Sequence, residues 1–124
     1  MFEGFKRILI MEPGELTGIA QAINTTNTGV IYDQGDGYLF LISYDICVAI
    51  YSIERNYIYR AWDGFSATSA KHIGLFCKYI NEKYNNGLSA FNYYDWKESK
   101  PNHGFDKKCY HIALLVRRHI TYRS

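Results

Sequence analysis

Short runs of β-branched and aromatic residues, separated by turn formers, fill the middle of the chain and predict antiparallel strands. The turn DQGDG, residues 33–37, and the polar residues 54–56 separate pairs of these runs, which predicts hairpins. The runs are apolar at nearly every position, so we expect a helix to cover one face of the sheet and aromatic side chains to occupy the other. The four runs are Val30–Tyr32, Tyr38–Tyr44, Ile46–Ile53 and Tyr57–Arg60.

A helical stripe follows these runs. Apolar residues recur at spacings of 3, 4, 7 and 11, which predicts one main helix over residues 66–84 that docks on the sheet. Ser66 or Thr68 can cap its first turn, and Gly87 can end it. The hydroxyls of the preceding stretch WDGFSATSAKH, residues 62–72, therefore have a structural explanation. The stripe consists of Ile73, Phe76, Cys77, Ile80 and Tyr84.

The N-terminal region predicts one strand and one short helix. FKRILI, residues 5–10, is a short apolar run that we assign to a strand. In EPGELTGIAQAIN, residues 12–24, the residues Leu16, Ile19, Ala20 and Ile23 have helical spacing. We therefore expect a short amphipathic helix over about residues 14–23.

The C-terminal run CYHIALLVRRHITY, residues 109–122, fits two periods. Tyr110, Ile112, Leu114 and Val116 alternate as in a strand, whereas Cys109, Ile112, Ala113 and Val116 have the spacing of a helix. Its β-branched content and the ending ITY favour a strand that completes the sheet.

These elements predict an α+β fold in a single domain, residues 1–124. We expect an antiparallel sheet of about four to five strands, packed against the main helix (about 66–84) and the short N-terminal helix (about 14–23). The chain of 124 residues is 48% hydrophobic and 21% charged, which is typical of a folded domain.

A long segment between residues 88 and 108 keeps neither period and is rich in aromatic and basic residues. Long ordered loops in compact domains are often functional. Aromatic rings beside lysines can stack on bases and hold phosphates, and the same residues also make hot spots for protein partners. The candidate binding residues here are Phe91, Tyr93, Tyr94, Trp96, Lys97 and Lys100.

Charge is distributed unevenly along the chain. Residues 1–65 carry a net charge of −4 and residues 66–124 a net charge of +6. The basic residues near the C-terminus include Arg117 and Arg118, which we also assign as candidate binding residues. Such a set can form a solvated edge that opposes aggregation, or it can contact an acidic protein surface or nucleic acid.

No residue pattern predicts catalysis, a metal site or a cofactor. Cys47, Cys77 and Cys109 are odd in number and far apart, which favours buried, reduced thiols in a cytoplasmic protein. The four histidines show no metal-ligand spacing. No phosphate-binding glycine motif occurs, and no run of 18 apolar residues predicts a membrane span.

Two segments resemble a pattern found in small proteins encoded by phages and prophages. SYDICVAI, residues 43–50, is similar to a strand S-Y-D-x-x-V-A, and WDGFSATSAKH is similar to a helix start W-D-[YF]-S-x-T-[ST]-x-[KR]-H. Gly64 departs from that second pattern, and the resemblance covers only about residues 38–84. Most members of this family have unknown functions, and phage proteins of this size include inhibitors of CRISPR nucleases.

The resemblance therefore implies a non-enzymatic, anti-CRISPR-like inhibitor that binds a host protein, such as a CRISPR effector nuclease, in the host cytoplasm. The alternative is a nucleic-acid-binding accessory protein that uses the aromatic and lysine loop. Dimerisation through the exposed edge of the sheet is compatible with the pattern, but no residue specifies it.

Overall fold

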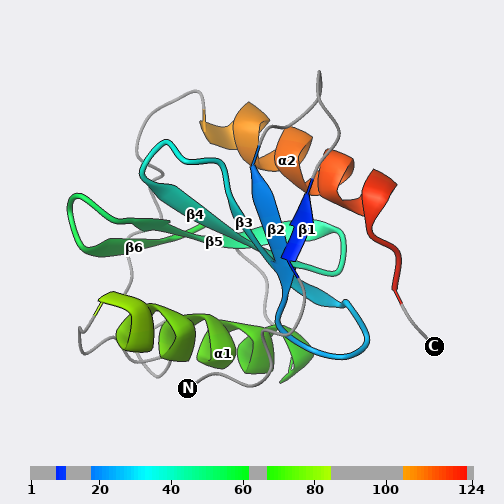
Figure 1. Ribbon diagram of the computed structural model, residues 1–124, viewed down its shortest axis with the longest axis horizontal. Coiled ribbons are helices and arrows are strands. Elements are labelled where there is room, and N and C mark those ends of the chain that lie inside the picture. The colour runs from blue at the N-terminus through cyan, green and yellow to red at the C-terminus, as the bar shows by residue number, and fades with distance from the viewer. Residues whose placement is uncertain (1–7, 11–17, 62–66, 85–104, 123–124) are drawn as a thin grey trace.

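The computed structural model describes residues 8–10, 18–61, 67–84 and 105–122, and these form an α+β fold. Six antiparallel strands follow one another in chain order across a single sheet, and one helix lies on each face (Figure 1). The strands are β1 (Ile8–Ile10), β2 (Ile19–Ala22), β3 (Gly29–Asp33), β4 (Tyr38–Ser43), β5 (Ile46–Ser52) and β6 (Tyr57–Arg60). The helices are α1 (Ala67–Tyr84) and α2 (Phe105–His119).

The predicted hairpins and the main helix are confirmed. Strands β3 to β6 lie where the apolar runs are, and each pairs with the next through a short turn. The stripe of α1 is buried against the sheet, including Ile73, Phe76, Cys77 and Ile80. The sheet has one strand more than the upper expectation of five.

The short helix expected over residues 14–23 is wrong for the part that the structure describes. Residues 19–22 form β2, in which Ala20 is fully buried opposite Tyr32 and Ile19 is exposed. The buried residues of this segment are Ala20 and Ala22, two positions apart as in a strand, and pairing with β1 and β3 satisfies the backbone groups. Residues 14–17 lie outside the described residues.

The strand favoured for residues 109–122 is also wrong, because α2 occupies residues 105–119. The helical alternative describes the packing: Cys109, Ile112, Ala113 and Val116 are buried on the sheet. Alternation would bury Tyr110 and Leu114 as well, but both are exposed. The choice between strand alternation and the helical period therefore decides which side chains of this segment are exposed.

Helices on both faces explain why the central strands are apolar throughout. One core cluster packs β-strand side chains such as Phe40 and Ile50 under α2, and the other packs Leu39 and Tyr51 under α1. The expectation that only one face is covered by a helix is wrong. A bulge between Leu41 and Ile42 shifts the register of β4 against β5, and neighbouring residues of β5 then face the same side.

Candidate functional site

An exposed apolar surface lies where the outer side of α2 meets the start of β5. Tyr110 and Leu114 are one helical turn apart on α2 and are 72% and 49% exposed, and Ile46 in β5 is 44% exposed. Scattered exposed apolar side chains are common, but a contiguous group of large ones marks an interaction site more often. We call this group, together with Tyr44 and Tyr122, the α2 surface.

A hollow of about 250 Å³ makes this surface concave. Ile46, Cys47 and Ala61 line it from the sheet side, and Cys109, Tyr110 and Ala113 line it from α2, with Asp45 at the turn. Because Ile46 and Tyr110 both line the hollow, the exposed residues of β5 and α2 meet there.

The turn between β4 and β5 holds an aromatic residue at a strained position. Tyr44 has a φ of 55°, in the left-handed region that normally favours glycine or asparagine. Its ring is 38% exposed and packs edge-on against the ring of Tyr122, with centroids 5.5 Å apart. A positive φ is what a two-residue hairpin turn requires at this position, and the turn presents the Tyr44 ring to solvent.

Arg117 fixes this turn from the C-terminal end of α2. Its guanidinium donates to the carbonyl oxygens of Tyr44, Asn27 (2.6 Å) and Thr28 (2.8 Å). Asn27 also has a left-handed backbone, with a φ of 60°. One planar fork therefore holds the β2–β3 and β4–β5 turns together.

Tyr122 completes the contacts around Arg117. The Arg117 guanidinium lies 4.6 Å from the Tyr122 ring centroid, and the Tyr122 hydroxyl donates to Asp45 at 2.6 Å. Burial, followed by the hydrogen bond to Asp45, raises the pKa of Tyr122 to about 12, so the hydroxyl stays a donor at neutral pH. Tyr44 and Tyr122 are thus held in place.

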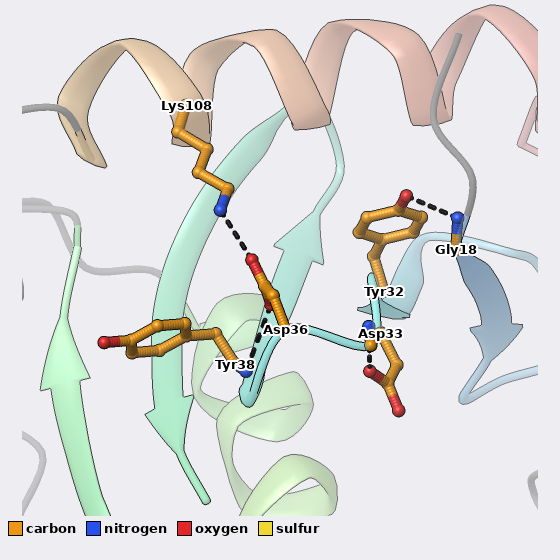
Figure 2. A network of polar contacts seen from close by, with 7 residues as sticks. Gly18, Tyr32, Asp33, Asp36, Tyr38 and Lys108 are labelled. Carbon is orange, nitrogen blue, oxygen red and sulfur yellow. Dashed lines mark hydrogen bonds and ion pairs between the residues drawn. The ribbon is translucent and has the colours of Figure 1, made fainter. Parts of the chain in front are cut away.

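The N-terminal part of α2 is fixed by an ion pair. Lys108 lies 2.7 Å from the Asp36 carboxylate in the β3–β4 turn, and Asp36 also accepts from the backbone N–H of Tyr38 (Figure 2). Below the helix, the Tyr32 hydroxyl accepts from the N–H of Gly18 at 2.8 Å. Helix α2 is therefore tied to a turn near each of its ends.

A serine–histidine pair lies near the α2 surface but is buried. The Ser43 hydroxyl is 2.7 Å from Nδ1 of His72, and each residue is 2% exposed. Burial, and then the charge of Arg117, lower the pKa of His72 to about 4, so the ring is neutral at pH 7. Such a pair raises the question of nucleophilic catalysis.

The Ser43–His72 pair belongs to a buried hydrogen-bond cluster that also contains Asn24 and Thr28. Asn24 accepts from the N–H of Gly29 through its Oδ1, which orients its Nδ2 toward Nε2 of His72 at 3.3 Å. Thr28 Oγ1 lies 3.2 Å from the same Nε2, so this nitrogen has one neighbour that can only donate and one that can donate or accept. Ser43 and His72 are both buried, so we interpret this cluster as a link between α1 and the two turns.

The candidate residues from the sequence fall into two groups. Arg117 and Arg118 lie on α2, where Arg117 binds backbone carbonyls and Arg118 is exposed. The aromatic and lysine loop lies outside the described residues: Phe91, Tyr93, Tyr94, Trp96, Lys97 and Lys100.

Sequence reasoning missed Tyr110, Leu114 and Ile46 as surface residues. The signal was available, because the helical period of residues 109–116 leaves Tyr110 and Leu114 outside the buried stripe.

The predicted burial of the cysteines is confirmed, since Cys47, Cys77 and Cys109 are all buried. Burial raises the pKa of the Cys77 thiol to about 12, which disfavours the thiolate. Across the described residues, no group of three or more His, Cys, Asp or Glu side chains could hold a metal ion. Within the same part of the chain, neither helix has the length and apolar character needed to cross a membrane.

Comparison with known proteins does not place the chain in a family: no family model, curated protein or solved structure matches it. The resemblance to small phage proteins rests on its two sequence segments alone.

Proposed function

We propose that this protein is a non-enzymatic binding protein that docks on a partner protein through the α2 surface. One observation carries the proposal: Tyr110 and Ile46 stand exposed at a mostly apolar hollow, with exposed Leu114 one turn farther along a helix that is fixed near both ends. Preformed, rigid apolar patches with aromatic anchors are the usual centres of protein interfaces.

The segments SYDICVAI and WDGFSATSAKH support a more specific role for this binding protein. On their resemblance to phage proteins, we propose an anti-CRISPR-like inhibitor that acts in the host cytoplasm on a defence complex such as a CRISPR effector nuclease. The α2 surface supplies the anchors, and the aromatic and lysine loop at residues 91–100 extends the contact.

The proposal is tested by affinity capture from a host that carries a CRISPR nuclease. Wild-type protein is expected to recover the effector, and the double substitution Tyr110→Ala with Leu114→Ala to lose it. Ile19→Ala is the matched control, because Ile19 is an equally exposed aliphatic residue on β2, outside the α2 surface. Capture that survives the double substitution in a folded variant would refute docking through α2.

The loop is tested in the same assay with Tyr94→Ala and Trp96→Ala. Loss of the effector with either substitution is the expected result if the loop contributes anchors. The alternative function, nucleic-acid binding, predicts steeply salt-dependent binding of bare DNA or RNA by the purified protein. Absence of that binding at low salt would remove the alternative.

A further inference from the structure

The size of the hollow limits what can occupy it. Pockets that take a whole small ligand usually enclose about 300–1,000 Å³, whereas this hollow has about 250 Å³ and is lined mainly by apolar side chains. It therefore suits one apolar side chain of a partner better than a free small molecule. Tyr110 and Ile46 stand at its margin and would contact the residues flanking that side chain.

The charge beside the hollow has one dominant sign. Helix α2 contains four Lys or Arg residues and one acid, Asp106. Lys108 pairs with Asp36, and Arg117 keeps its charge while it donates to backbone carbonyls. Tyr110, Leu114 and Arg118 follow at spacings of four residues, so they share one side of the helix, and all three are exposed. Asp45, the acid that lines the hollow, already accepts the hydroxyl of Tyr122.

The positions of Tyr110 and Arg118 also predict the distance between the apolar and the acidic groups of a partner. Eight residues separate Tyr110 from Arg118, which corresponds to about 12 Å along an α-helix. A partner that fills the hollow beside Tyr110 would thus meet positive charge about two helical turns farther along α2.

We infer that the occupant of the α2 surface is an acidic amphipathic segment of a partner protein, with an apolar anchor in the hollow and carboxylates about 12 Å away beside Arg118. This inference rests on the proposed function and names the chemistry of the partner. A second copy of the chain fits poorly, since a symmetric contact between two α2 helices would bring like charges together. A nucleic-acid backbone would leave Tyr110, Leu114 and the hollow without apolar contacts.

Three fluorescein-labelled probes test the inference with the full-length protein. The first is a 20-residue helical peptide with a leucine pair near one end and three glutamates beginning eight residues later. The second replaces the glutamates with lysines, and the third is a single-stranded DNA 20-mer. We expect the glutamate peptide to bind, and the lysine peptide and the DNA to bind at least roughly ten-fold more weakly at low salt.

A charge exchange identifies the contact. Arg118→Glu is expected to lower the affinity for the glutamate peptide by roughly ten-fold and to raise the affinity for the lysine peptide. Lys71→Glu, at an exposed position of α1 on the other face of the sheet, makes the same charge change and should alter neither affinity.

The thiols report whether the hollow is filled. Cys47 and Cys109 line it, whereas Cys77 lies on the buried face of α1 in the other core cluster. Bound glutamate peptide should slow maleimide labelling of Cys47 and Cys109 and leave that of Cys77 unchanged.

Three results would overturn the inference: no binding of the glutamate peptide, equal binding of the lysine peptide or the DNA, or binding that leaves labelling of Cys47 and Cys109 unchanged. The capture experiment with Tyr110→Ala and Leu114→Ala does not use these probes. A partner could be captured through α2 while the acidic peptide fails, so the two failures are distinguishable.

Discussion

At the scale of single residues, Arg117 contributes more to the shape of the candidate site than to its charge. Its five donors form a planar fork, and three backbone carbonyls from two turns occupy it. Two of these carbonyls belong to Asn27 and Tyr44, whose left-handed conformations are costly without such support. The sequence suggested a binding arginine, whereas the geometry describes a positioning residue.

Replacing Arg117 with lysine should therefore destabilise the fold despite preserving the charge. Lysine cannot reach three carbonyls in one plane, and the loss should cost about 1–3 kcal/mol in the free energy of unfolding. Urea denaturation measures this cost. Arg118→Lys serves as the control, and an equal effect of both substitutions would contradict the assigned role of Arg117.

The lowered pKa of His72 predicts that the fold loses stability in mild acid. Its pKa is lowered to about 4 in the folded state, from about 6.5 in the unfolded chain, so the unfolded state takes up the proton first. The stabilisation is complete above pH 6.5 and falls as the pH drops toward 4, by about 1–2 kcal/mol after allowance for solvent screening.

Urea denaturation between pH 7.5 and 4.5 measures this change, and His72→Gln, which cannot gain the charge, should flatten it. An NMR titration of the His72 ring gives an independent value. A ring that titrates near 6.5 in the folded protein would show that the burial argument is wrong.

At the scale of elements, the sequence predicted the strands well and its two amphipathic segments poorly. The runs from β3 to β6 are bounded by strong turn formers and are too short for helices. Their sequences therefore predict strands without an alternative. Residues 19–22 and 109–119 fit both periods, and only tertiary pairing decides between them. Strand β2 gains partners on both sides, and α2 gains a complete sheet face to cover.

Two alanine substitutions in α2 distinguish the helix from the strand in solution. Ile112 is 1% exposed in the helix, so Ile112→Ala should cost about 2–5 kcal/mol. Leu114 points outward, and Leu114→Ala should change the free energy of unfolding by no more than about 0.5 kcal/mol. Alternation in a strand would place both residues on one face, so similar costs in urea denaturation would contradict the helix.

At the scale of the whole molecule, the α+β class and the antiparallel sheet were predictable, but the candidate site was not. The site joins residues 44–46 to residues 110–122, and no sequence pattern indicates that these segments lie together. Its exposed face follows from the helical period of α2 and from the two contacts that tie the helix to the turns. Function is less constrained than fold, because a binding surface needs no sequence motif.

Photo-crosslinking in host cells gives the most direct test that α2 carries a docking surface. A benzoylphenylalanine side chain is introduced in place of Leu114, and in place of Ile19 as the control, since both residues are about half exposed. The account predicts a discrete crosslinked adduct with one host protein from position 114 and none from position 19. No adduct from position 114, or the same adduct from both positions, would contradict it.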